Sequence, residues 1–353
     1  MACRQPPRLW RKSPRSSATV CVNTGFKFRN KIALLTRPLV AVAAFVSTVA
    51  ATAQTFPSRP ITLIVPVTAG GSTDLMARQI AEPLSRALGQ PVVVENKPGA
   101  SVNIAASYVA KAKPDGHTLL AVYSGYHAAN PFLFKKLDWD PVKDFLPVAL
   151  IINSAQAIAV TDKLPVKTFK ELVAYAKANP GKLTYGTLGS GSLHHISGSL
   201  LEQLAETKMI AVAYKGTGPT VTDLAAGNVD IVITTPPGVI PLSQTGKIRI
   251  LAVTGNQRLP SLPNVPSAAE EGFPNFSVNA WFGFVAPMGT QPELIKRLAD
   301  DMAKAVQLDS FKKGVEGAGG SVQFQGTAAF DAIIKRDIQM FARVIRAANI
   351  SAE

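Results

Sequence analysis

The hydrophobic pattern of the chain changes sharply between residues 61 and 89. Ile61–Val65 is a short apolar run rich in β-branched residues, which predicts a buried strand. The run is followed by apolar residues at helical spacing, which predict a helix: Met76, Ile80, Leu84 and Leu88. Residues 70–74, with the sequence GGSTD, separate the two patterns. A glycine turn at a helix start exposes unpaired N–H groups at the positive end of the helix dipole, so this turn is a candidate anion site.

A second segment of the same kind lies at residues 183–205, LTYGTLGSGSLHHISGSLLEQLA. The glycines and serines of this turn supply N–H and hydroxyl donors at the start of another helical pattern. Two such turns on one chain indicate a cleft that closes on an acidic small molecule.

Strand-like runs alternate with helical runs over the rest of the chain, which predicts an α/β architecture. The sequence Thr168–Glu171 fits a helix capping box, and Phe330–Ile345 follows a helical spacing of about five turns. A further helix is marked by Leu294, Leu298 and Met302. The other strand candidates are Val92–Glu95, Thr118–Val122, Val148–Ile152, Ala157–Val160, Leu183–Tyr185, Ile210–Tyr214, Asp230–Thr235, Ile248–Val253 and Phe282–Ala286.

The basic charge of the chain is concentrated at its N-terminus. The formal net charge of the 353 residues is +14, yet residues 1–55 hold nine Lys or Arg residues and no acidic residue. The remainder has 28 basic and 23 acidic residues, a net charge of +5. Because this remainder contains no basic run interleaved with aromatic residues, we expect no nucleic-acid partner.

The N-terminal segment has the layout of a secretory signal. A basic region precedes the apolar run Leu39–Ala50, and small residues follow before Gln54. We therefore treat residues 1–53 as a leader that is cleaved near Ala53-Gln54. Because signal peptides are about 15–30 residues long, we expect the true translation start to lie downstream of Met1. A retained N-terminal anchor is the alternative, but the run of about 12 residues is short for a membrane span of roughly 20. Both cysteines, Cys3 and Cys21, lie in this leader, so the mature chain has no disulfide, cysteine nucleophile or thiolate metal site.

Eight sequence blocks between Phe56 and the C-terminus resemble, in order, the Bug/TctC family of extracytoplasmic solute receptors of tripartite tricarboxylate transporters. They are PITLIVPVTAGGSTDLMAR, VVVENKPGASVNIAA, KPDGHTLL, NPFLFKKLDWDPVKDFLPVALI, LTYGTLGSGSLHHI, VAYKGTGPTVTDLAAGNVDI, IRILAVTGNQRLPSLPNVPSAAEEGF and WFGFVAPMGTQPELI. The resemblance implies a two-lobed type II periplasmic-binding-protein (Venus flytrap) fold with a ligand cleft between the lobes. It implies crossovers near Ser154–Ala157 and Ser277–Ala280. Lobe one is then 56–155 plus 279–353, and lobe two is 156–278.

The resemblance also implies that a small carboxylate is held mainly by backbone groups. Asp74 is either an internal partner of its turn or a contact for a ligand amine, and His195 either caps its helix or touches the ligand. Lys215 either supplies positive charge or lies on the surface, whereas His194 is expected to face solvent and Trp281 to pack at the hinge. The candidate ligand-binding residues are Ala69, Gly70, Gly71, Ser72, Thr73, Asp74, Tyr123, Ser124, Gly189, Ser190, Gly191, Ser192, His195, Lys215 and Thr235.

The expected function is therefore a monomeric periplasmic binding protein that delivers a di- or tricarboxylate, an aromatic carboxylate or an acidic amino acid to permease subunits in the membrane. A co-receptor that presents its ligand to a membrane sensor kinase is the alternative. A secreted hydrolase is disfavoured because the sequence has no G-x-S-x-G elbow, H-E-x-x-H, Walker lysine or G-x-G-x-x-G fingerprint. We expect no cofactor, no metal and no catalytic residue.

Overall fold

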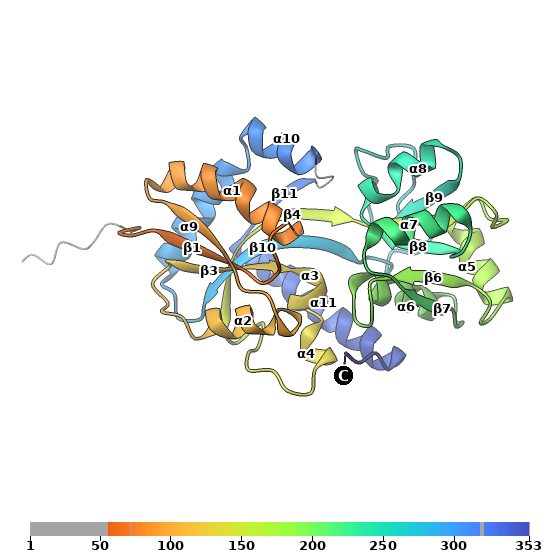
Figure 1. The fold of residues 1–353 in the computed structure, drawn as a ribbon, viewed down its shortest axis with the longest axis horizontal. Helices are drawn as coiled ribbons and strands as arrows, with labels where there is room; N and C mark the ends of the chain where they lie inside the picture. Colours follow the sequence, from red (N-terminus) through yellow and green to blue (C-terminus); the bar gives the residue numbers. More distant parts are fainter. Residues whose placement is uncertain (1–55, 71, 318–320, 353) are drawn as a thin grey trace, which may run out of the picture. The chain divides into compact units, whose positions relative to one another are not determined.

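The computed structural model describes residues 56–70, 72–317 and 321–352 as two α/β lobes, each built on one sheet (Figure 1). The leader, its two cysteines, the Ala53-Gln54 cleavage site and Gly71 lie outside these residues. The described residues contain no helix long and apolar enough to cross a membrane.

The first sheet has six strands in the order β11-β4-β10-β3-β1-β2. The strands β1, β2 and β3 are parallel to one another, whereas β10 runs antiparallel to β3 and β4, and β11 antiparallel to β4. The strand bounds are β1 Ile61–Val65, β2 Val92–Asn96, β3 Thr118–Tyr123, β4 Phe145–Ala155, β10 Asn279–Pro287 and β11 Val322–Gly326.

Helices cover both faces of this sheet, which explains why β1 is apolar at every position except Thr62 instead of alternating. Ile61, Leu63 and Val65 pack with α1, α9 and α10, while Ile64 packs on the other face with α2 and α11. The helices of this lobe are α1 Ser72–Leu88, α2 Asn103–Ala110, α3 Ser124–His127, α4 Asn130–Leu133, α9 Pro292–Ala305, α10 Asp309–Gly317 and α11 Thr327–Ala348, with the 3₁₀ turn η1 Ala100–Val102 before α2.

The second sheet has five strands in the order β7-β6-β8-β5-β9. The strands β7, β6 and β8 are parallel, and β5 is antiparallel to β8 and β9. The strands are β5 Ala157–Thr161, β6 Thr184–Thr187, β7 Ile210–Ala213, β8 Ile231–Thr234 and β9 Ile248–Val253. The helices are α5 Phe169–Ala178, α6 Leu193–Leu204, α7 Thr217–Ala226 and α8 Ile240–Gln244, with the 3₁₀ turn η2 Pro236–Gly238.

The chain passes twice between the sheets. It leaves β4 of the first sheet and enters β5 of the second at Gln156, and it returns between β9 and β10. The returning segment is an ordered loop, because Gly255 donates a backbone hydrogen bond to Phe276 and Val253 donates one to Pro266. Helix α6 of the second lobe also packs into the core of the first, where its Leu193 and Ile196 join residues of α11.

Candidate functional site

The first glycine turn connects β1 to α1 and is organised around the carboxylate of Asp74, which is 1% exposed. The Gly70 N–H and the Arg78 Nε donate to its Oδ2 at 2.9 Å each, and the Asn96 amide donates to its Oδ1 at 2.8 Å. Burial alone would raise the pKa of Asp74, but the hydrogen bonds from Arg78, Gly70 and Asn96 outweigh burial and lower that pKa. Asp74 is therefore an ionised internal acceptor of the turn.

The remaining groups of this turn are largely open to solvent. Ala69, Gly70 and Ser72 are exposed, and Gly70 has a φ of +88°, a conformation that glycine adopts without strain. Thr73 is buried, with its hydroxyl 3.4 Å from the Tyr126 hydroxyl. The turn therefore presents backbone and the Ser72 hydroxyl to solvent at the start of a helix of 17 residues.

The second glycine turn connects β6 to α6, and its polar side chains accept hydrogen bonds from backbone N–H groups of the same segment. The Ser192 Oγ caps the helix by accepting the His195 N–H at 3.2 Å, and the Gly191 N–H donates to His195 Nδ1 at 3.2 Å. Burial lowers the pKa of His195, which matches a neutral ring that accepts this hydrogen bond. Gly189 and Gly191 both have positive φ values, +101° and +74°.

Two residues of this turn also touch the first lobe. The Ser190 hydroxyl donates to the Ser351 carbonyl at 2.6 Å, and an added Cβ at Gly191 would lie 2.5 Å from the Leu133 side chain. The hydroxyl hydrogen of Ser190 is therefore used within the protein. His195 Nδ1 accepts from Gly191, so Ser190 and His195 are each bonded to other groups and not to each other.

The expectation that His194 faces solvent is wrong. Its ring is half-buried, and its Nε2 lies 3.1 Å from the Thr234 hydroxyl at the end of β8. Burial lowers the pKa of His194 to about 4, so the ring is neutral at pH 7. The sequence does not reveal this contact because its two partners are 40 residues apart.

The candidate residues gather at the carboxyl edge of each sheet. In the first sheet, the turn after β1 shares an edge with Tyr123, the last residue of β3, and with Ser124 after it, because β1 and β3 are parallel. In the second sheet, the turn after β6, Lys215 after β7 and Thr235 after β8 share an edge for the same reason. Ligands of open α/β sheets bind beyond this edge.

Three of these residues differ in what they offer a ligand. Ser124 is fully buried and ties β3 to β10, because its hydroxyl donates to the Asn279 carbonyl at 3.0 Å. Thr235 is half-buried. Lys215 is exposed and forms no ion pair with any residue that the structure describes. Of the three, Lys215 and Thr235 remain open to a ligand.

A buried polar network at the crossover was not predicted from the sequence. The side-chain amide nitrogen of Gln156 donates to Ser197 Oγ at 2.8 Å and to the Val278 carbonyl at 2.9 Å. The Thr254 hydroxyl accepts the backbone N–H of Gln156 at 2.8 Å and donates to the Val278 carbonyl at 2.9 Å. The only signal in the sequence is a glutamine between two apolar runs that predict strands.

Trp281 lies near this crossover, on β10. It is fully buried, and its indole Nε1 donates to Asp337 Oδ2 at 2.7 Å. It therefore packs within the first lobe and has no exposed face to stack on a ligand.

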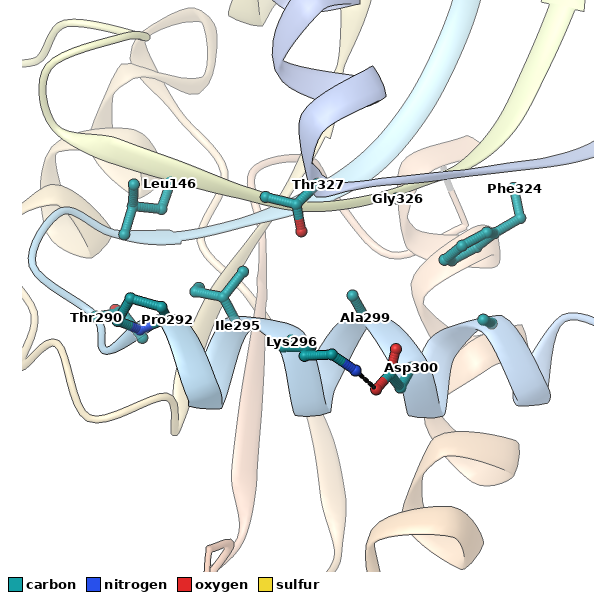
Figure 2. A pocket seen from close by; sticks show the side chains of 11 residues that line it. Leu146, Thr290, Pro292, Ile295, Lys296, Ala299, Asp300, Phe324, Gly326 and Thr327 are labelled. Carbon is teal, nitrogen blue, oxygen red and sulfur yellow. Dashed lines mark hydrogen bonds and ion pairs between the residues drawn. The ribbon is translucent and has the colours of Figure 1, made fainter.

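A cavity of about 470 Å³ lies elsewhere in the first lobe, between α9 and β11 (Figure 2). Its walls include Ile295, Ala299 and Phe324, and Lys296 pairs with Asp300 at its rim. The two threonine hydroxyls in its lining donate to backbone carbonyls. It contains none of the candidate ligand-binding residues and offers a ligand no unpartnered polar side chain. Among the described residues, no group of three or more His, Cys, Asp or Glu side chains is placed to hold a metal ion.

Comparison with known proteins identifies the family. Residues 76–350 match the model of the tripartite tricarboxylate transporter family receptor, TctC. The chain is 33% identical over 317 residues to protein BugT of Bordetella pertussis, covering 88% of this chain and 97% of BugT.

Two solved structures of carboxylate complexes are also similar. The R. palustris protein Rpa4515 with adipate is 37% identical, with a TM-score of 0.69 over 84% of this chain and 99% of that one. MatC from Rhodopseudomonas palustris with bound malate is 33% identical, with a TM-score of 0.66 over 82% of this chain and 100% of that one. The chain therefore belongs to the TctC family of solute-binding receptors of tripartite tricarboxylate transporters, as the sequence blocks indicate.

Proposed function

We propose that this protein captures a small carboxylate between its two lobes and delivers it to the permease subunits of a tripartite transporter. The lobes are residues 56–155 with 279–353, and residues 156–278. The observation that carries the proposal is the pair of glycine turns, each of which opens a helix at the carboxyl edge of its sheet. The relatives with adipate and malate support the ligand class.

The ligand is held mainly by backbone groups. The Asp74 carboxylate in the first turn and the His195 imidazole in the second already accept hydrogen bonds from within the protein. The remaining donors include backbone N–H groups, the hydroxyls of Ser72 and Thr235, and the Lys215 ammonium.

These donors are sufficient for a typical receptor affinity. Hydrogen bonds to a charged group contribute roughly 1.5–3 kcal/mol each, and a helix N-terminus adds about 0.3–2 kcal/mol. Four or five such contacts support micromolar binding, about −8 kcal/mol, after the cost of ordering the site and closing the lobes.

The site of action is the periplasm. The N-terminal basic region, the apolar run and the small residues before Gln54 are the features of an export signal. Cleavage near Ala53-Gln54 releases a receptor that meets its permease at the outer surface of the inner membrane.

Ligand screening by thermal unfolding tests the proposal. The exported protein is purified and heated with dicarboxylates, tricarboxylates, aromatic carboxylates and acidic amino acids, and with matched neutral amides as controls. At a ligand concentration 100 times Kd, about 2.7 kcal/mol of stabilisation is expected, which raises the melting temperature by several degrees. If every carboxylate leaves the melting temperature unchanged, the proposal is wrong.

A further inference from the structure

A groove of about 480 Å³ lies on the first lobe, between α2 and the loop that follows α4. One wall is the outer face of α2, where four residues recur at helical spacing: Ile104, Ser107, Tyr108 and Lys111. The other wall is the loop at residues 136–138. None of the candidate ligand-binding residues lines this groove, so it is a separate surface of the same lobe.

The α2 wall presents two adjacent large apolar side chains to solvent. Ile104 is 51% exposed and Tyr108 is 49% exposed. The opposite side of the helix packs into the lobe through Ala105, Ala106 and Val109. The core therefore does not use Ile104 or Tyr108. A contiguous apolar surface that is bordered by polar and charged residues is typical of a protein-binding site.

Both side chains are held in place within the receptor itself. A Cβ added at Gly99 would lie 2.7 Å from Ile104 Cδ1, so this glycine leaves the space that the isoleucine occupies. The Lys97 ammonium lies 4.4 Å from the centroid of the Tyr108 ring, and Lys97 also pairs with Glu95. Side chains that are already ordered lose little conformational entropy when a partner binds.

The backbone that leads into α2 is strained. Ala100, Ser101 and Val102 have φ values of +45°, +51° and +72°, a region that β-branched residues such as valine rarely adopt. The Asn130 side chain holds this turn by donating to the Ser101 carbonyl at 2.8 Å. Such strain persists only where the surrounding structure enforces it, and it is concentrated at functional sites. Here it fixes the point from which α2 starts and hence the position of Ile104.

The charges that line the groove favour an acidic partner. Lys111 and Lys136 form no ion pair with any residue that the structure describes, and the Lys111 ammonium donates to Ser107 Oγ at 3.1 Å. Asp138 lines the groove as well, and it too forms no ion pair among the described residues. Two ammonium groups against one carboxylate leave the lining net positive, so a partner with negative charge is complementary to it.

Two other occupants fit this surface less well. A second copy of the chain that docks through the same face would bring the lysines of both copies together, because a two-fold interface uses the same patch on each subunit. Such like-charge contacts are unfavourable. An anionic lipid surface would attract Lys111 and Lys136, but it would repel Asp138 and it has no side chain that fills a groove.

The groove lies at the ligand edge of the first sheet. Strands β1 and β2 are parallel, so the turn after β1 and the start of α2 after β2 share that edge. The two are joined by Asn96, the last residue of β2, which donates to Asp74 Oδ1 at 2.8 Å and to the Val67 carbonyl at 2.9 Å. A partner seated on α2 therefore contacts the part of the lobe that carries the first glycine turn.

We propose that this groove is the surface through which the receptor docks on its membrane permease, and that the permease segment seated in it is acidic and carries an apolar side chain. The acidic groups of the segment pair with Lys111 and Lys136. Its apolar side chain packs against Ile104 and Tyr108. This inference rests on the proposed function, because it assumes that a permease receives the carboxylate.

Direct binding to the permease tests the inference. The permease subunits of the transporter to which this receptor belongs are placed in phosphatidylcholine nanodiscs. The Kd of the exported receptor for these nanodiscs is measured for the wild type, Ile104→Ala, Lys136→Glu and Ile210→Ala. The last is the matched control, because Ile210 is also 51% exposed but lies on β7 of the second lobe. The thermal screen with carboxylates is repeated on each variant and reports ligand capture separately.

The expected result is a loss of docking without a loss of capture. Ile104→Ala and Lys136→Glu each raise the Kd for the nanodiscs by about 10-fold or more, as truncation of a central contact does, and Ile210→Ala leaves it unchanged. The wild-type Kd rises with salt concentration, and it rises less steeply in Lys136→Glu. All variants keep the melting temperature and the carboxylate response of the wild type, because the substituted side chains are exposed and lie outside the two glycine turns.

Three results would overturn the inference. Wild-type Kd values for Ile104→Ala and Lys136→Glu would show that another face meets the permease, while the proposed function stands. Binding to permease-free phosphatidylglycerol vesicles that is lost in Ile104→Ala would identify the partner of this face as lipid. A wild type that responds to carboxylates but binds no permease would refute docking and delivery and leave capture intact. If no carboxylate changes the melting temperature, capture itself fails, and docking is judged by the nanodisc Kd values alone.

Discussion

Single residues decide which groups at the two turns remain available to a ligand. Asp74 is occupied by Gly70, Arg78 and Asn96, and His195 is occupied by Gly191. A sequence motif names these side chains as candidates, but only the structure shows that their polar atoms already have partners. The groups that remain available to a ligand are mainly backbone groups, with few side chains. The motif therefore does not indicate which carboxylate binds.

Replacing Asp74 tests its role as an internal acceptor. Asp74→Ala leaves three donors without their acceptor, so we expect a loss of about 2 kcal/mol in the free energy of unfolding at pH 7. Because the folded pKa of Asp74 is lowered below 3.8, its contribution is present above that pH and is lost as the pH falls through the folded pKa. Denaturant unfolding at pH 7 and pH 3 measures both effects.

The control for this prediction is on the same helix. Glu82 pairs with Arg86 on an exposed surface, where their side chains are 76% and 68% accessible, so Glu82→Ala is expected to cost less than about 0.5 kcal/mol. Equal losses for Asp74→Ala and Glu82→Ala would contradict the role assigned to Asp74.

His194 makes stability depend on pH in mildly acidic solution. Its pKa is about 4 in the folded chain and near 6.5 when unfolded, so its contribution is complete above pH 6.5 and is lost as the pH falls toward 4. His194→Gln keeps a partner for Thr234 and removes the titration. The wild type is expected to lose more stability than this variant between pH 7 and pH 5 in denaturant unfolding. The pKa of His127 is also lowered to about 4, but this residue is present in both proteins and cancels. Parallel pH profiles would contradict the burial of His194.

At the scale of elements, buried strands were predicted well because both faces of each sheet are covered. Mainly apolar runs, interrupted only by Thr62 and Arg249, therefore mark β1 and β9, whose predicted bounds are confirmed. Strand β11 was missed, since Val322 and Phe324 alternate with glutamines over only five residues before a helix.

The capping box at α5 is half formed. The Thr168 hydroxyl accepts the Glu171 N–H, but the Glu171 carboxylate accepts from Lys167 instead of Thr168.

The contact of the second turn with α4 is testable by comparing two glycines. Gly191 and Gly181 have nearly equal φ values, +74° and +72°. A Cβ added at Gly191 would lie 2.5 Å from the Leu133 side chain, whereas a Cβ added at Gly181 would have no neighbour within 4 Å. Gly181→Ala is expected to cost about 1–2 kcal/mol through backbone strain alone. Gly191→Ala is expected to cost about 1–3 kcal/mol more, as overpacking does. Denaturant unfolding measures both variants, and equal costs would show that the turn does not touch Leu133.

At the scale of the whole molecule, the contacts at the crossover and between the lobes join distant parts of the sequence. Gln156 contacts Ser197 and Val278, 41 and 122 residues away, and Ser190 contacts Ser351, 161 residues away. Local patterns predict the elements and place each glycine turn at the end of a strand. They carry no information on which side chains far apart in the sequence meet in the fold, which is why the crossover network and the His194 contact were not predicted.

Gln156→Leu tests that network with little change in volume. The substitution removes an amide that is 1% exposed and leaves the Ser197 hydroxyl and the Val278 carbonyl with one partner fewer. We expect a loss of about 2 kcal/mol in the free energy of unfolding. Gln203→Leu is the control, because the exposed Gln203 also donates from α6 to the first lobe, at the Val344 carbonyl, and is expected to cost less than about 1 kcal/mol. Equal losses of stability for Gln156→Leu and Gln203→Leu would contradict the larger contribution assigned to the crossover network.

We expect backbone amides of both glycine turns to hold one carboxylate ligand. A crystal structure of the exported protein with the tightest-binding acid from the screen would locate the ligand. Its oxygens are expected within hydrogen-bonding distance, about 2.7–3.2 Å, of N–H groups in the turns at residues 69–74 and 189–192. A ligand bound away from these turns, or held by one turn alone, would contradict this expectation.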